Sequence, residues 1–235
     1  MQSHSTLDMA HKHLRRVDTD ALGHARNRLA ETGIARLSFL LPYRVRRMLA
    51  AEALTVLDHH RQWGERLPEA QDLPRRPVDL DEPEVTAHAP AIPQLYDCES
   101  LRDNLSVIAA EPVLPFPGCH RFTVSRAHHD DSAGQWHWEQ HAFTLVLIVE
   151  CPPLEEGGFV QTVAHTDRDW DHHDVYRTLT RNPIHSWELH PGDLYLMRTD
   201  TTLHRVHPFT HGRRTVLAMT FASRANLEQT RDAIA

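Results

Sequence analysis

Long apolar runs are absent from this sequence of 235 residues. A membrane-spanning helix needs about 20 consecutive apolar residues. A secretory signal needs an apolar core, which the opening residues, MQSHSTLDMAHKHLRR, do not contain. We therefore expect a cytoplasmic protein with no membrane partner.

Cysteine is also scarce, and acidic residues outnumber basic ones. The three cysteines, Cys98, Cys119 and Cys151, are odd in number and far apart, which argues against a disulfide framework and against a CxxC zinc site. The formal net charge is -7. Since a domain that binds nucleic acid is normally basic, we expect no nucleic-acid partner.

Apolar residues make up 40% of the chain, enough to form a core. The length suits one domain, residues 1–235, with a mainly helical part at 1–111 and a strand-rich core at 112–225. The sequence leaves open whether this domain is a monomer or a homodimer. Histidine is abundant, with 20 residues, so only spacing and context can single out a metal ligand.

The first half has helical character. The expected helices are 18–30, stopped by Gly33, then 42–63 and 97–110. Between the first two, residues 35–41 are typical of a strand. Residues 1–17 are polar, and we expect them to be frayed. Residues 66–94 are rich in proline and acidic residues, and we expect a long loop.

The second half alternates between apolar and polar residues, as short strands do. The expected strands are 120–126, 143–149, 159–163, 184–189, 194–198 and 215–222, with one helix at 167–179. Helices followed by strands indicate an α+β fold in which a helical layer packs on a β-sandwich or jelly roll.

A candidate metal site precedes the most hydrophobic strand. His137 and Glu139 are two residues apart, so on extended backbone their side chains point to the same face. His204, 65 residues after Glu139, is a candidate third ligand. Two histidines and one carboxylate leave three coordination positions open for a chelating cosubstrate and dioxygen, as in iron(II) oxygenases. An HxE pair alone can merely flank a strand, and a zinc hydrolase uses similar ligands.

Arg214 favours the oxygenase over the hydrolase. It lies ten residues after His204, at the start of an apolar strand. A guanidinium there can bind the distal carboxylate of 2-oxoglutarate through two hydrogen bonds, and we expect Thr144 to contribute to the same site. Arg213 alternates to the other face and is expected to meet solvent.

Four runs of the chain resemble the small bacterial iron(II)/2-oxoglutarate enzymes that halogenate or hydroxylate free amino acids such as lysine. They are WHWEQHAFTLVLIVECP, EEGGFVQTVAHT, RNPIHSWELHPGDLYLMRTDTTLHRVHPF and GRRTVLAMTFAS. The resemblance covers residues 93–225 and implies a double-stranded β-helix, a cupin-like jelly roll. It also implies His137 and His204 as iron ligands, Arg214 as the anchor of 2-oxoglutarate, and dioxygen as the oxidant.

Position 139 sets the expected chemistry. Halogenases of the family have a small residue there, which leaves a coordination site for chloride, whereas this chain has Glu139. We therefore expect hydroxylation, or desaturation or ring closure from the same substrate radical, rather than halogenation.

The substrate is expected to differ from lysine. Where the lysine enzymes of the family place acidic residues around the substrate ammonium, this chain has His120 and Gln140. An unpaired ammonium is costly in a buried pocket. A lysine-derived amino acid whose amine has become a nitro group, 6-nitronorleucine, closing to a cyclopropane, fits these residues. Arg75 and Arg76 stand where the family has an arginine that binds the amino acid carboxylate, although solvated loop charges are equally expected there.

Two alternatives remain at this point. One is a lysine or ornithine hydroxylase. The other, from a different class, is a non-catalytic β-sandwich sensor that binds a small acid through Arg214 and whose histidines are structural.

Overall fold

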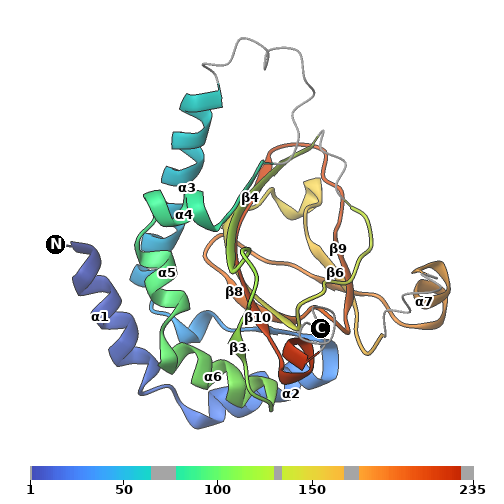
Figure 1. Cartoon of the computed structure of the whole chain (residues 1–235). Helices are drawn as coiled ribbons and strands as arrows, with labels where there is room; N and C mark the ends of the chain where they lie inside the picture. The colour runs from blue at the N-terminus through green and yellow to red at the C-terminus, as the bar shows by residue number, and fades with distance from the viewer. Residues whose placement is uncertain (1, 65–77, 130–133, 167–174, 229–235) are drawn as a thin grey trace.

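The computed structural model describes residues 2–64, 78–129, 134–166 and 175–228. Helices cover one face of a large antiparallel sheet, and a smaller sheet packs against its other face (Figure 1). This is the predicted double-stranded β-helix with N-terminal helices on its sheet.

The large sheet has the strand order β1-β8-β5-β10-β4-β2, and β3 pairs with β10. Its strands are β1 (Ile34–Arg36), β2 (Val78–Leu80), β3 (Leu114–Pro115), β4 (Phe122–His128), β5 (Phe143–Glu150), β8 (Leu194–Arg198) and β10 (Arg213–Ala222). The small sheet has the order β7-β6-β9, formed by β6 (Val160–Val163), β7 (His185–Trp187) and β9 (Leu203–Val206). All of these pairings are antiparallel.

Alternation along the central strands gives the large sheet two apolar faces. Leu145 of β5 and Leu217 of β10 pack in the core shared with the helices. Their neighbours Val146 and Val216 belong to a second cluster, with Val160 of the small sheet. We call the space between the two sheets, where this second cluster lies, the barrel interior.

Six helices lie on the outer face of the large sheet. They are α1 (Gln2–Leu14), α2 (Thr19–Thr32), α3 (Tyr43–Gly64), α4 (Glu82–His88), α5 (Ala91–Tyr96) and α6 (Glu99–Ala109). A further helix, α7 (Val175–Arg181), lies away from this layer (Figure 1). Asp18 caps the start of α2, and Gly33 ends it with a φ of 72°, as its place in the sequence predicted.

Two predictions for the first half were wrong. Within residues 1–17, which were expected to be frayed, the described part forms helix α1. This helix buries Leu7, Ala10 and Leu14, whose helical spacing is hidden among polar neighbours. The segment 66–94 is not one long loop, since its described part, from residue 78 on, forms β2, α4 and α5. Pro83 lies in the first turn of α4, where proline is compatible with a helix.

Smaller differences concern strand ends. The strand expected at 35–41 stops at Arg36 and continues as a 3₁₀ turn, Ser38–Leu40.

Strand β9 was not predicted. Of the helix expected at 167–179, residues 167–174 lie outside the described residues, and the rest is part of α7.

None of the helices described is both long and apolar enough to cross a membrane.

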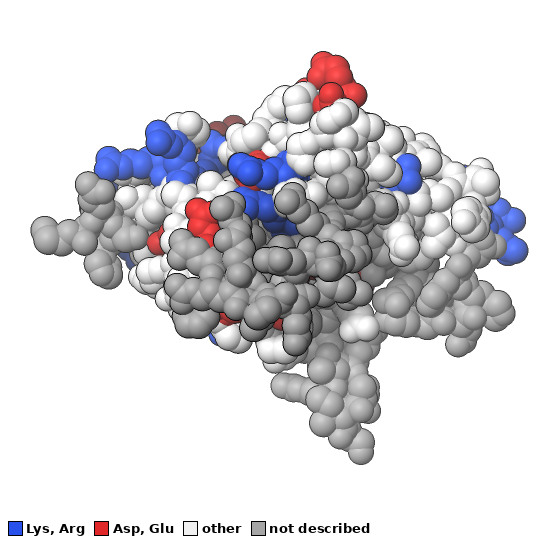
Figure 2. All heavy atoms as spheres, turned by 90° about the horizontal axis from the view of Figure 1, so that it is seen from above, with Lys and Arg blue, Asp and Glu red and all other residues white. Residues whose placement is uncertain are grey.

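The face seen from above carries charges of both signs. Figure 2 shows separate groups of lysine and arginine side chains, with acidic and uncharged residues between them. The described part of this face is therefore mixed in charge.

Candidate metal centre

The two histidines of the predicted triad lie on neighbouring backbone segments. The backbone N–H of each donates to the carbonyl of the other at 3.0 Å, so the segment around His137 extends the small sheet beyond β9. The ring centroids of His137 and His204 are 4.3 Å apart. The sheet pairing thus brings together two residues that are far apart in sequence.

Glu139 completes the cluster. Ligand atoms of His137, Glu139 and His204 all lie within 4.8 Å of one another, and His137 Nε2 is 3.4 Å from Glu139 Oε1. The backbone N–H of Glu139 donates to Thr199 O at 3.1 Å. The structure therefore brings the three predicted ligands to one place.

Both imidazoles are oriented by backbone carbonyls. His137 Nδ1 lies 2.9 Å from Gln135 O, and His204 Nδ1 lies 2.8 Å from Thr202 O. A ring nitrogen that bonds to a carbonyl must carry the hydrogen, so in each imidazole Nε2 is the nitrogen left for a metal.

The charges of the cluster also suit a cation. The hydrogen bond from His137 lowers the pKa of Glu139 to about 2, although burial opposes the shift. Burial, followed by the charge of nearby His137, lowers the pKa of His204 to about 4. Near neutral pH, Glu139 is thus ionised and His204 neutral, the forms in which these side chains bind metals. Burial opposes a positive charge on His137, but its contacts with Glu139 and with the carbonyl of Gln135 raise its pKa, so a metal displaces a proton that His137 shares with Glu139.

Arg214 points into the barrel interior. It is only 8% exposed, and its Nε makes no hydrogen bond within the described part of the chain. Tyr195 of β8 contacts it, and burial raises the pKa of this tyrosine. Arg213 lies on the opposite face of the sheet, where its Nη2 is 2.7 Å from Glu150 Oε1. The two arginines thus take the two faces that alternation predicted.

Thr144 lies near the other end of the interior face. It is paired across the sheet with Thr220, six residues along β10 from Arg214, a length of about 20 Å of strand. The side chain of Arg214 and a bound 2-oxoglutarate would together cover part of that length. The two predicted cosubstrate contacts therefore lie toward opposite ends of the interior face of the large sheet.

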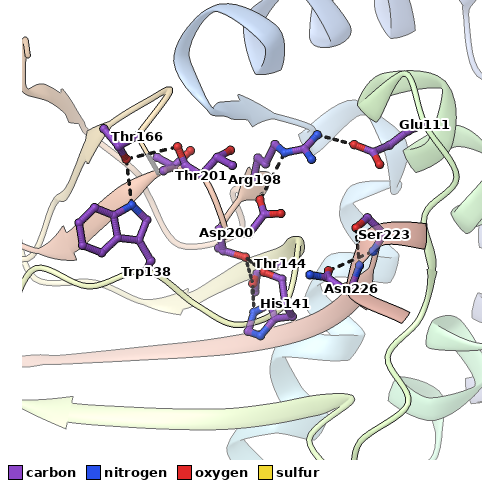
Figure 3. Close-up of polar contacts among 12 residues, drawn as sticks. Glu111, Trp138, His141, Thr144, Thr166, Arg198, Asp200, Thr201, Ser223 and Asn226 are labelled. Atoms are coloured by element: carbon purple, nitrogen blue, oxygen red, sulfur yellow. Dashed lines mark hydrogen bonds and ion pairs between the residues drawn. The ribbon is translucent and has the colours of Figure 1, made fainter. Parts of the chain in front are cut away.

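His141 is a polar residue that the sequence analysis missed. Its Nε2 lies 2.7 Å from Thr144 Oγ1, and Figure 3 shows the two side chains facing each other. Nearby, Arg198 pairs with both Asp200 and Glu111. The spacing of two residues between Glu139 and His141 was the pattern that could have revealed it.

The four residues predicted to contact the substrate are not part of the three-residue ligand cluster. His120 Nδ1 lies 3.0 Å from Asp81 Oδ1. Gln140, which follows Glu139 in the chain, is exposed. Its backbone carbonyl accepts a hydrogen bond from the side-chain Nδ2 of Asn226 at 3.3 Å. Arg75 and Arg76 lie outside the described residues.

Comparison with known proteins gives the family. The Halogenase D family model matches residues 17–233. This chain belongs to the Halogenase D family. It is thus an enzyme, and the non-catalytic sensor is not supported. No curated protein matches the chain in sequence.

Solved structures similar to this member of the Halogenase D family share its fold. AviO1 from Streptomyces viridochromogenes Tue57 has a TM-score of 0.67 at 16% identity, and the match covers 89% of this chain and 98% of AviO1. SnoK, a non-haem α-ketoglutarate-dependent carbocyclase from nogalamycin biosynthesis, has a TM-score of 0.65 at 13% identity and coverages of 89% and 85%. A Pseudomonas putida prolyl-4-hydroxylase has a TM-score of 0.51 at 20% identity and coverages of 86% and 99%. At these identities the likeness shows the double-stranded β-helix fold alone.

Proposed function

We propose that this enzyme is a non-haem iron(II) oxygenase that uses 2-oxoglutarate and dioxygen to oxidise an aliphatic C–H bond of a free amino acid. The observation that carries the proposal is the cluster of His137, Glu139 and His204, whose ligand atoms lie within 4.8 Å of one another. SnoK, which shares the fold, is an α-ketoglutarate-dependent enzyme.

The residues present fit an iron(II) ion. Two imidazole nitrogens and one carboxylate form a set that suits iron and leaves coordination positions open. When bound, the iron supplies the redox chemistry that activates dioxygen at the expense of 2-oxoglutarate. The protein orients both imidazoles through the carbonyls of Gln135 and Thr202.

Arg214 supplies the site for the distal carboxylate of 2-oxoglutarate. A buried guanidinium with an unpaired N–H is unfavourable unless a ligand satisfies it, and the Nε of Arg214 is such a group. Thr144, at the metal end of the interior, lies where the other end of the cosubstrate is expected. A zinc hydrolase using the same three ligands has no need for this buried arginine.

Glu139 directs the reaction away from halogenation, despite the family's name. Its carboxylate reaches the metal cluster and occupies a position that a halide ligand needs. The substrate radical is then expected to be hydroxylated, or to lose a second hydrogen or close a ring.

The substrate we propose is a lysine-derived amino acid without a free side-chain amine, such as 6-nitronorleucine. The support is the residue types: His120 and Gln140 stand at the positions where acidic residues are expected around an ammonium. Arg75 and Arg76, at sequence positions where the family has a carboxylate-binding arginine, lie outside the described residues. However, Asp81 lies 3.0 Å from His120, which brings a carboxylate near one of these positions. A lysine or ornithine hydroxylase therefore stays the alternative.

A side-by-side assay of lysine, ornithine, norleucine and 6-nitronorleucine tests the substrate class. We expect 6-nitronorleucine to release succinate stoichiometrically with an oxidised product detected by mass. Because a charged hydrogen bond is worth about 1.5–3 kcal/mol, lysine should bind at least about tenfold more weakly. Efficient, tightly coupled lysine hydroxylation would contradict this substrate and leave the iron site standing.

A further inference from the structure

His141 lies two residues after the proposed iron ligand Glu139. The backbone bends over residues 140–142, between Glu139 and the start of β5, so His141 does not simply continue the alternation of His137 and Glu139. His141 is half-buried, and the edge of its ring meets Phe116 at a centroid distance of 5.9 Å. It does not belong to the three-residue ligand cluster.

A hydrogen-bonded ring joins the His141 side chain to its own backbone. His141 Nε2 lies 2.7 Å from Thr144 Oγ1, and Thr144 Oγ1 lies 3.4 Å from Thr199 Oγ1. Thr199 Oγ1 then donates to His141 O at 2.9 Å. One donor order satisfies every group: the imidazole N–H donates to Thr144, Thr144 to Thr199, and Thr199 to the carbonyl. Figure 3 shows the His141–Thr144 part of this ring.

Thr199 also binds the backbone of Glu139. Thr199 O accepts the N–H of Glu139 at 3.1 Å, and the N–H of Thr199 donates to Ala142 O at 2.9 Å. Residues 139 to 142 are therefore fastened to the end of β8 at both sides of His141. A shift of this hydrogen-bonded ring is therefore expected to move the backbone that carries the Glu139 carboxylate.

We propose that Thr144 and His141 are positioning residues that fix Glu139 for metal binding. The inference rests on the iron site proposed above and assigns Thr144 a role before any cosubstrate arrives. Partners that orient metal ligands typically contribute 10-fold to 100-fold in metal affinity, about the range expected here. A threonine that only contacts 2-oxoglutarate has no such effect on the metal alone.

The test is anaerobic calorimetric titration of the whole protein with Fe(II) in the absence of 2-oxoglutarate. The variants are Thr144→Val, which keeps the shape and removes the hydroxyl, Thr144→Ser, which retains the hydroxyl, and His141→Phe. The double variant Thr144→Val/His141→Phe completes a double-mutant cycle, which measures whether the two side chains act together. Thr55→Val is the matched control, because the hydroxyl of Thr55 bonds only within α3, on its exposed side.

We expect Thr144→Val and His141→Phe each to weaken Fe(II) binding by about tenfold or more. The double variant should be about as weak as either single variant, since both break one ring, while Thr144→Ser and Thr55→Val bind like the wild type. Binding within twofold of the wild type in both single variants, or no rescue by serine, overturns the inference. A wild-type protein that binds no Fe(II) contradicts the proposed function itself and the inference with it.

Discussion

At the scale of single residues, neighbouring arginines on β10 give the sharpest contrast. Arg214 is buried in the barrel interior, while Arg213 pairs with Glu150 on the other face. Arg214→Ala should raise the 2-oxoglutarate concentration needed for half-maximal succinate release, because losing one partner of a desolvated ion pair costs about 2–5 kcal/mol. Arg213→Ala, the matched control, should change it little, since exposed ion pairs contribute about 0–1 kcal/mol. A larger effect of Arg213→Ala than of Arg214→Ala would show that the two arginines have been assigned to the wrong faces of β10.

Glu139 carries a second prediction. Because its carboxylate occupies the position that a halide ligand needs, the wild-type enzyme should form no chlorinated product in high chloride. Glu139→Gly opens that position, yet we expect mainly loss of activity, because radical placement also decides the outcome. Mass spectrometry of products made with and without chloride checks both points. Chlorination by the unmutated enzyme would refute the role given to Glu139.

Only part of the candidate metal site follows from local rules, since His204 was named from its spacing and from the family resemblance, and the surroundings of the cluster were not predicted. Alternation on extended backbone placed His137 with Glu139, and it placed Arg214 inside and Arg213 outside. His141 was missed because its role depends on a hydroxyl, Thr199, that only the packing of β8 brings near. Sequence spacing contains no information on that contact.

At the scale of elements, α1 anchors the helical layer through a few apolar side chains. Leu14 is 2% exposed. Leu14→Ala should lower the free energy of unfolding by about 2–5 kcal/mol, measured by urea denaturation, while Fe(II) affinity stays unchanged because α1 lies outside the barrel. The control is Leu154→Ala, since Leu154 is 46% exposed and surface changes usually stay within about 0.5 kcal/mol. Equal stability of the two variants would mean that α1 does not pack as described.

Elements with strong patterns were predicted, and elements held by tertiary contacts were not. The alternating apolar residues of β5 and β10 identify both strands. By contrast, β9 has only four residues, Leu203–Val206, and its pairing with β6 and with His137 decides its conformation. Propensity alone is too weak to specify so short a strand.

At the scale of the whole molecule, no single element contains the site. The segment before β5 provides His137 and Glu139, the small sheet provides His204 through β9, and the large sheet provides Arg214 through β10. The apolar cluster between the sheets, with Val146 on one side and Val160 on the other, holds these parts together. The position of Arg214 relative to the metal cluster therefore depends on how the two sheets pack.

The most direct test of the central claim is the visible spectrum of the protein with Fe(II) and 2-oxoglutarate under anaerobic conditions. A chelated cosubstrate on iron(II) gives a weak charge-transfer band, and we predict this band for the wild-type protein. It should be absent from folded His204→Ala and should need more 2-oxoglutarate in Arg214→Ala. A wild-type protein without the band, or a His204→Ala variant that retains it, would contradict the proposed iron site.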